Sequence, residues 1–416
     1  MTCEQKTNAP RTQAHWTDID WAAIDWTAVN WAETASPRIN WVDFYRTAPT
    51  INFAGGTTRP TRGTATATET QAPETETGGE SYGAAASSWT AQREFPVTVF
   101  GIREPQPGPR WKALFDATWP AYRAFYQSGP DARPELDEAR GMLEKHMPEL
   151  MPTWRKLVEL TGNDDVAARF LTMWNFPAFA PACSQAALTG DETSLTRNYD
   201  YVPSLWEATV YSSEFTGRKV IGTGDCLWGL LDGMNDAGLA VSLTFGGRPG
   251  SGPGFAIPIV IRYLLEVAET AEQARELLRD LPVSMSYNIT VVDTSGDKFT
   301  AFVAPGQQAE FFDACTATNH RGKEPEYPAK AAQFFSKERL EHLDRTVETE
   351  ITADEMRDQF LTDPLYQDNF SGGFGTLFTA HYRPDEGHVE YRWPGVSWKR
   401  GFEDADDTLD VVLVGR

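Results

Sequence analysis

The chain has 416 residues, of which 41% are hydrophobic, so it can bury a large core in one big domain or two small ones. Its formal net charge is −22, from 59 acidic and 37 basic side chains. This acidic excess argues against nucleic acid and anionic membrane surfaces as partners, because both are bound by clusters of Lys and Arg. We interpret the acidity as a feature that keeps the protein in solution.

The cysteines and the apolar runs indicate where the protein works. Cys3, Cys183, Cys226 and Cys315 form neither a CxxC pair nor a dense disulfide framework, so a reducing compartment is the simpler interpretation. The first residues have no apolar segment typical of a signal peptide. No run approaches the roughly 18 apolar residues of a transmembrane helix. We therefore expect a soluble, cytoplasmic protein without a membrane span.

Neither a metal nor a cofactor is predicted. The six histidines form no HxxxH or HExxH pair, which makes a metal site improbable. The Gly/Pro-rich segment 246–255 lacks the GxxxxGK(S/T) pattern of a phosphate-binding loop. A loop over a substrate pocket and an ordinary surface loop both remain open for this segment.

Residues 1–94 differ from the rest of the chain. They contain a spaced tryptophan series: Trp16, Trp21, Trp26, Trp31 and Trp41. A five-residue period fits neither a helix nor a strand for long, so the series indicates either an arm that docks on a partner or on its own domain, or a tandem duplication in a weakly ordered arm. Residues 55–88 are rich in Thr, Gly, Ala and Glu, which predicts a disordered linker.

The composition becomes globular near Phe95, and residues 95–182 are predicted to form a mainly helical pre-segment. The pattern predicts a short strand and then four helices, at 97–102, 111–126, 134–150, 151–160 and 166–173. We expect a third domain over residues 183–416, which begins at a cysteine.

The stretch from Cys183 to Tyr201, CSQAALTGDETSLTRNYDY, carries the first chemical signal. A thiol becomes an acyl-accepting nucleophile when it has a proton acceptor and nearby positive charge. The spacing to Arg197 and Asp200 predicts a β-hairpin whose second strand places both side chains beside Cys183. Residues three apart on a strand point to opposite faces, so we expect the backbone to bend there.

The remaining segments predict hairpins with helices between them. Turns are expected at 235–238 and 294–297, and an apolar stripe predicts one or two helices over 259–281. Strands are expected at 206–212, 219–223, 239–245, 310–317, 377–382, 388–393 and 408–414, with a helix at 331–347. This order favours an α+β fold over alternating βαβ units.

Five motifs in order complete the picture: Cys183, RNYDY, LDGMNDAGLAVSLTF, ATNH and SKERLEHL. With them the chain resembles the N-terminal-nucleophile hydrolases of the choloylglycine hydrolase and acyl-coenzyme A:6-aminopenicillanic acid acyltransferase-like group. The resemblance implies a four-layer αββα sandwich with two antiparallel sheets. In this group a helical segment often precedes the nucleophile and can be a propeptide that the enzyme cuts off itself, which is one role open to residues 95–182.

The resemblance assigns roles to individual residues. Cys183 would be the nucleophile, with its own α-amino group as general base after cleavage of the Ala182–Cys183 bond. Asp200 would hold that amino group, and Arg197 would favour the thiolate. Asn319 matches the family's oxyanion-binding asparagine. Arg339 matches the family's arginine that completes the charge network.

Three other positions leave questions open. Thr244 stands where bile salt hydrolases have Asn, so bile salts are in doubt as substrates. Either the Thr244 hydroxyl or the local backbone N–H is a candidate second oxyanion donor. Asn288 resembles a family position on an inner strand, but we assign it no catalytic role. His320 follows Asn319 and offers a competing Cys183–His320 dyad that needs no self-cleavage.

The sequence therefore predicts an enzyme that hydrolyses or transfers acyl groups at linear carbon–nitrogen bonds other than peptide bonds, through a Cys183 thioester. Its partner would be a small-molecule amide or acyl substrate, and a homo-oligomer is left open. The alternatives are an unprocessed Cys–His hydrolase and a non-catalytic binding protein that uses the Trp-rich arm.

Overall fold

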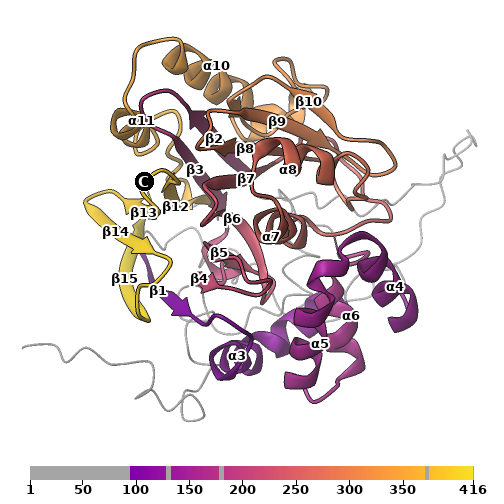
Figure 1. Ribbon diagram of the computed structural model, residues 1–416. Coiled ribbons are helices and arrows are strands. Elements are labelled where there is room, and N and C mark those ends of the chain that lie inside the picture. Colours follow the sequence, from indigo (N-terminus) through magenta and orange to yellow (C-terminus); the bar gives the residue numbers. More distant parts are fainter. Residues whose placement is uncertain (1–93, 128–132, 178–181, 371–373, 416) are drawn as a thin grey trace, which may run out of the picture.

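The computed structural model describes residues 94–127, 133–177, 182–370 and 374–415, so the predicted Trp-rich arm and its linker lie outside the described residues. Two β-sheets face each other, with helices on their outer faces (Figure 1). This arrangement confirms the predicted αββα sandwich. Among the described residues, no helix is long and apolar enough to cross a lipid bilayer.

The larger sheet has nine strands in the order β10-β9-β8-β7-β6-β5-β4-β1-β15. In chain order they are β1 (Glu94–Arg103), β4 (Thr209–Ser213), β5 (Val220–Asp225), β6 (Gly229–Asn235), β7 (Leu239–Phe245), β8 (Tyr287–Asp293), β9 (Lys298–Val303), β10 (Glu310–Phe312) and β15 (Asp407–Val414). All neighbours in this sheet are antiparallel except β1 and β4, which run parallel. The predicted antiparallel sheet therefore contains one parallel pair, which is made by a strand from before Cys183.

The smaller sheet has six strands in the order β11-β2-β3-β12-β13-β14. They are β2 (Ala182–Leu188), β3 (Ser194–Tyr201), β11 (Thr316–Ala317), β12 (Gly375–Arg383), β13 (His388–Trp393) and β14 (Val396–Gly401). The single strand predicted over 310–317 is wrong, because β10 and β11 are separate and belong to different sheets. The strand β14 had no sequence signal that we recognised.

Helices cover both outer faces. α7 (Ile257–Val267) and α8 (Ala271–Leu278) pack on the nine-stranded sheet, while α10 (Ser336–Val347) and α11 (Ala353–Gln359) pack on the six-stranded sheet. The 259–281 stripe is thus two helices, and the 331–347 pattern is divided between α9 (Pro328–Gln333) and α10. At this break Phe335 has a left-handed φ of 49°.

Before the cysteine, β1 leads into a group of helices: α3 (Pro109–Tyr126), α4 (Leu136–His146), η2 (Pro148–Leu150), α5 (Met151–Leu160) and α6 (Asp165–Thr172). A further short helix, η3 (Pro203–Leu205), follows β3. The Trp111 indole N–H donates to the Leu227 carbonyl at 3.1 Å, and the Trp228 indole donates to the Leu171 carbonyl at 3.0 Å. These two bonds tie the helices to the loop between β5 and β6.

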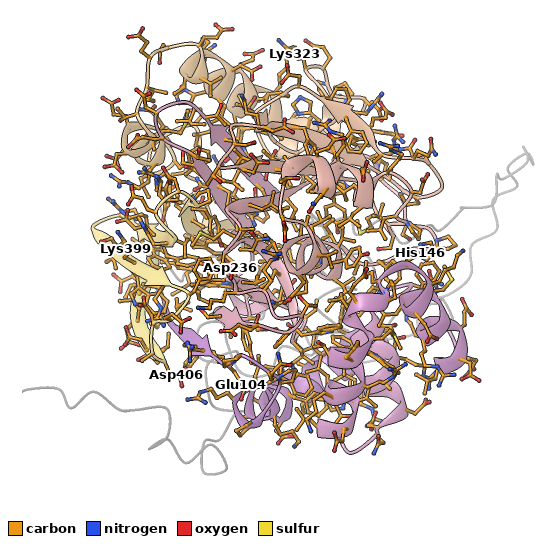
Figure 2. All side chains as sticks on the ribbon, viewed as in Figure 1. Glu104, His146, Asp236, Lys323, Lys399 and Asp406 are labelled. Atoms are coloured by element: carbon orange, nitrogen blue, oxygen red, sulfur yellow. The ribbon has the colours of Figure 1, made fainter. Side chains whose placement is uncertain are left out.

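Glu104, labelled in Figure 2, anchors the start of α3 against the nine-stranded sheet. Its carboxylate accepts the backbone N–H groups of Arg110 and Trp111 at 2.9 and 2.8 Å, and the Tyr211 hydroxyl at 3.0 Å. A carboxylate at a helix N-terminus satisfies otherwise unpaired donors and complements the helix dipole. The pre-segment is therefore attached to β4 by a buried polar contact as well as by apolar packing.

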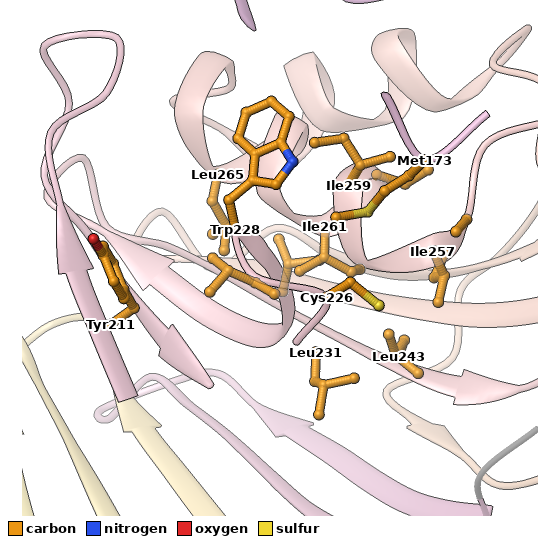
Figure 3. Close-up of a cluster of buried hydrophobic side chains, with 14 of the residues drawn as sticks. Met173, Tyr211, Cys226, Trp228, Leu231, Leu243, Ile257, Ile259, Ile261 and Leu265 are labelled. Carbon is orange, nitrogen blue, oxygen red and sulfur yellow. The ribbon is translucent and has the colours of Figure 1, made fainter. Parts of the chain in front are cut away.

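The core continues from the sheet into these helices. Figure 3 shows Met173, from the end of the helical segment before Cys183, in the same cluster as Trp228, Cys226 and the α7 residues Ile259 and Ile261. All of these side chains are buried. Residues on both sides of Cys183 therefore contribute to one core.

The backbone of β5 at Gly222 packs closely against the backbone of the neighbouring strand β6, which carries Asp232. A Cβ at Gly222 of β5 would lie 2.1 Å from the carbonyl oxygen of Asp232 in β6. We predict that Gly222→Ala lowers the free energy of unfolding by about 2 kcal/mol or more, because backbone atoms must shift to admit the methyl group. Chemical denaturation of the purified protein measures this loss.

Gly141→Ala is the matched control, since Gly141 lies exposed within α4 and a Cβ there would meet no atom within 4 Å. It should raise the free energy of unfolding by about 0.5–1 kcal/mol through the lower chain entropy of alanine. Equal unfolding midpoints for the two variants would contradict the packing argument.

Candidate active site

Cys183 is the second residue of β2 and is fully buried between the layers. The predicted β-hairpin is present, with Cys183 opposite Tyr199 and Gln185 opposite Arg197 in the β2–β3 register. The Arg197 Nη2 group donates a hydrogen bond to the Cys183 Sγ atom at 2.8 Å. The hairpin therefore places a guanidinium group directly against the thiol.

A carboxylate holds Arg197 from the opposite sheet. Arg197 Nη1 donates to Asp232 Oδ2 of β6 at 2.6 Å, and neither side chain is exposed to solvent. The Asp232 carboxylate also accepts the hydroxyl groups of Thr223, at 2.6 Å, and of Tyr382. The guanidinium carbon lies 4.9 Å from the centre of the Tyr199 ring, so an aromatic face and an ion pair together fix the position of Arg197.

Asp200 reaches the cysteine by a different route. Its carboxylate accepts Arg339 Nη1 of α10 and the Thr376 hydroxyl, both at 2.7 Å. Arg339 Nη2 donates to Asn319 Oδ1 at 2.8 Å, and the same oxygen accepts the backbone N–H of Cys183 at 3.0 Å. The side chains of Arg339 and Asn319 thus connect the Asp200 carboxylate with the nitrogen atom of Cys183.

The bend expected between Arg197 and Asp200 is a wrong prediction. The β2–β3 register is continuous, and the irregularity lies in β12 between Thr376 and Phe378. Arg197 points between the sheets towards β6, whereas Asp200 points outwards to α10. Each reaches one end of the same cysteine, so no bend of β3 is needed.

Thr244 supports the loop of Asn319 instead of facing the thiol. Its hydroxyl donates to the Thr318 carbonyl at 2.7 Å. A hydroxyl group has a single proton to donate, so this bond removes the basis for expecting the Thr244 hydroxyl as a second oxyanion donor. Asn319 Nδ2 has a longer contact, 3.4 Å to the Phe245 carbonyl, which a substrate oxygen could replace.

His320 is directed away from Cys183. Its Nδ1 atom lies 2.7 Å from Ser336 Oγ, and its Nε2 atom lies 3.3 Å from the Lys323 carbonyl. Burial also lowers the pKa of His320. Because both ring nitrogens have other partners, this geometry does not support the alternative Cys183–His320 dyad.

The electrostatic environment keeps the thiol protonated in the continuous chain. Burial raises the pKa of Cys183 to about 11, although Arg197 opposes this shift. Burial also raises the pKa of Asp200, against the opposing charge of Arg339. For Arg197, burial alone would lower the pKa, but its interactions with Cys183 and Asp232 outweigh burial and raise the pKa. Two arginines and two carboxylates balance each other, so a thiolate would add an unbalanced charge.

Sequence reasoning missed Asp232, Thr376 and Tyr382. Asp232 stands within the LDGMNDAGLAVSLTF motif, from which the sequence predicted a turn and singled out Thr244, but no acidic site residue. Thr376 and Tyr382 lie on β12, far along the chain from their partners, and no local pattern marks them. Within the described ranges, no group of three or more His, Cys, Asp or Glu side chains could hold a metal ion.

Comparison with known proteins matches the chain to a protein family. Residues 187–398 match the family model described as acyl-coenzyme A:6-aminopenicillanic acid acyl-transferase. The matched range contains Arg197, Asp200, Asn319 and Arg339, and it begins shortly after Cys183. No curated protein sequence matches the chain.

Solved structures of low identity are also similar to the chain. A mutant of the conjugated bile acid hydrolase from Clostridium perfringens has 11% identity and a TM-score of 0.40, covering 55% of this chain and 96% of that one. The penicillin V acylase from Agrobacterium tumefaciens has 14% identity and a TM-score of 0.34, covering 50% of this chain and 82% of that one.

The protonated thiol leads to a prediction about reactivity. In the chain with an intact Ala182–Cys183 bond, alkylation of Cys183 by iodoacetamide should be slow at pH 7, because only the thiolate reacts. The alkylation rate should rise about tenfold per pH unit and should not level off below about pH 10. Mass spectrometry of the Cys183 peptide measures the rate. A plateau reached near pH 8 would show that burial does not control this thiol.

Asp232→Asn should lower the pKa of Cys183 by about one unit or more, because Arg197 would lose the charge that neutralises it. The pH profile of alkylation gives the shift. Asp293→Asn is the control, since Asp293 is a similarly buried carboxylate that accepts the Ala271 N–H, outside this network. A pKa of Cys183 that is unchanged or higher in Asp232→Asn would contradict the assigned charge balance.

Proposed function

The chain belongs to the acyl-coenzyme A:6-aminopenicillanic acid acyl-transferase family, and from this premise we propose that it is a cysteine-nucleophile amidase or acyltransferase acting on linear carbon–nitrogen amide bonds. One observation carries the proposal: Asn319 Oδ1 accepts the backbone N–H of Cys183 at 3.0 Å. This acceptor would hold the same nitrogen as an α-amino group once the Ala182–Cys183 bond is cut. This contact supports the proposal of a free N-terminal cysteine.

The first step of the proposal is self-cleavage. The Cys183 thiol attacks the Ala182 carbonyl carbon, and the thiol proton passes to the departing Cys183 nitrogen. Water then hydrolyses the resulting thioester, which leaves a carboxylate on Ala182 and a free amine and thiol on Cys183. The new amine, with an ordinary pKa near 8, supplies the general base that the buried thiol lacks in the uncut chain.

Turnover of an amide would use the same atoms. The α-amino group takes the thiol proton, and the sulfur attacks the substrate carbonyl carbon. Asn319 Nδ2 exchanges its long contact with Phe245 for a hydrogen bond to the developing oxyanion. The intermediate collapses to a Cys183 thioester, and the departing amine takes the proton from the α-ammonium group.

The acceptor that resolves the thioester decides between the two activities. Water gives hydrolysis, and an amine or a thiol gives acyl transfer. The description of the family names a coenzyme A thioester and an amine, 6-aminopenicillanic acid, which favours testing acyl transfer beside hydrolysis. We propose a reducing compartment such as the cytoplasm, since Cys183, Cys226 and Cys315 are all free thiols.

The competing functions have less support. The ring of His320 engages Ser336 and Lys323, so a Cys–His hydrolase would require the ring to leave both partners. A non-catalytic binding protein would have no use for two ion pairs buried beside a thiol. Such pairs are costly to desolvate and are a poor source of stability.

The decisive test is intact mass and denaturing gel analysis of the wild type beside Cys183→Ala and Cys226→Ala. We expect the wild type and Cys226→Ala to separate into two fragments that meet at Ala182–Cys183, whereas Cys183→Ala stays whole. Cys226 is the matched control because it is also a buried free thiol. A panel of amides and acyl thioesters, with trapping of the acyl-enzyme on Cys183, then tests the reaction.

Cleavage at the same bond in Cys183→Ala would overturn self-processing by this thiol. A wild type that stays whole under all conditions would overturn the free-amine mechanism.

A further inference from the structure

The carbonyl groups on both sides of Asn319 converge on one buried side chain. Asn288 Nδ2 donates to the Thr318 carbonyl at 2.8 Å and to the His320 carbonyl at 3.0 Å. Asn288 lies on β8, opposite Thr244 of β7, and is 2% exposed. A primary amide has two N–H protons, and the two shortest contacts of this amide are the carbonyls of the residues before and after Asn319. The same Nδ2 group also lies 3.2 Å from the Thr244 hydroxyl oxygen.

We propose that Asn288 is a positioning residue for the oxyanion site, because it fixes the backbone on both sides of Asn319. This inference rests on the proposed function, in which Asn319 Nδ2 binds the oxyanion and Asn319 Oδ1 holds the Cys183 nitrogen. Asn288 itself lies behind the loop and acts on the reaction only through Asn319.

Other contacts hold the same three residues. The Thr244 hydroxyl donates to the Thr318 carbonyl at 2.7 Å, so this oxygen has two donors from the nine-stranded sheet. A Cβ at Gly247 would lie 2.5 Å from the Asn319 carbonyl oxygen, and Gly247 has a φ of +79°. Only glycine fits such a position without strain, so the backbone after β7 also presses against Asn319.

The helix α10 closes the loop from the outer side. The Thr318 hydroxyl donates to the Ser336 carbonyl at 2.8 Å, and the Ser336 hydroxyl lies 2.7 Å from His320 Nδ1. Ser336 begins the helix whose next turn carries Arg339, the donor to Asn319 Oδ1. The Asn319 side chain is therefore held by α10, while its backbone is held mainly by Asn288 and its neighbours in the sheet.

Asn198 provides a matched control. It is also fully buried, and its Nδ2 group donates to the carbonyls of Phe360 and Leu365 at 2.8 and 3.1 Å. The chemistry is the same as at Asn288, but the carbonyls belong to α11 and its loop on the outer layer. Loss of a buried asparagine can thus be separated from loss of this particular contact.

The kinetic test is a double-mutant cycle with Asn288→Ala and Asn319→Ala. Asn288→Ala should lower kcat about 100-fold with KM within about threefold, since a shift of the donor weakens binding of the transition state more than of the substrate. In the Asn319→Ala background, Asn288→Ala should lower kcat further by less than about threefold. Asn198→Ala should leave kcat nearly unchanged in both backgrounds.

The proposal would be overturned if Asn288→Ala lowered kcat by the same factor in the wild type and in the Asn319→Ala variant. A general structural role of Asn288 would give this result, because the two losses of kcat would then be independent. If Asn288→Ala does not fold, Thr244→Val replaces it in the cycle. That variant removes one of the two bonds to the Thr318 carbonyl, so it should show a smaller loss of kcat with the same dependence on Asn319.

A measurement that needs no turnover separates this inference from the proposed function. Hydrogen exchange of the backbone amides in peptides covering 314–322 should accelerate at least tenfold in Asn288→Ala, but not in Asn198→Ala. Unchanged exchange in these peptides would overturn the positioning role. If exchange is faster in Asn288→Ala but the protein turns over no amide or thioester, the positioning role of Asn288 stands. The absence of turnover would then count against the proposed reaction.

Discussion

Two arginines with no exposure to solvent, Arg197 and Arg339, lie in the candidate site, and each forms an ion pair with one buried carboxylate. A guanidinium taken out of water is tolerated only with such a partner, so β6 must present Asp232 to Arg197, and β3 must present Asp200 to Arg339. Burial raises the pKa of the thiol that contacts Arg197 to about 11, although the charge of Arg197 opposes this shift.

Polar contacts across the sandwich maintain this arrangement. Gln185, two residues after Cys183, donates to the Thr290 hydroxyl at 2.7 Å and accepts a hydrogen bond from Ser242. Both partners belong to the opposite sheet. Apolar packing alone would allow the sheets to slide, whereas directional bonds in a low-dielectric interior specify one register. The distance between Arg197 and Asp232 is thereby set by neighbouring strands as well as by the ion pair.

The sequence predicted the local features well, because a hairpin and its alternation are encoded by adjacent residues. The contact between the side chains of Cys183 and Arg197 is such a local feature, because one hairpin holds both residues. Asn319 and Arg339 were predicted from the family motifs. The distant contacts were not readable. Thr244 looked like an oxyanion donor until its hydroxyl was seen to bind the Thr318 carbonyl, and no periodicity shows that β12 carries partners for both carboxylates. Such contacts depend on which strands become neighbours, which spacing along the chain does not determine.

The strand β1 lies before the cysteine in sequence but inside the nine-stranded sheet in space, between β15 and β4. Cleavage of the Ala182–Cys183 bond would therefore divide the polypeptide into two fragments that stay together. Backbone hydrogen bonds on both edges of β1 would hold the N-terminal fragment in the sheet. A gene shortened to start at Cys183 would encode a different molecule. Its last strand, β15, would have lost β1, the strand with which it pairs among the described residues, so maturation by cutting and synthesis from the cut point are not equivalent.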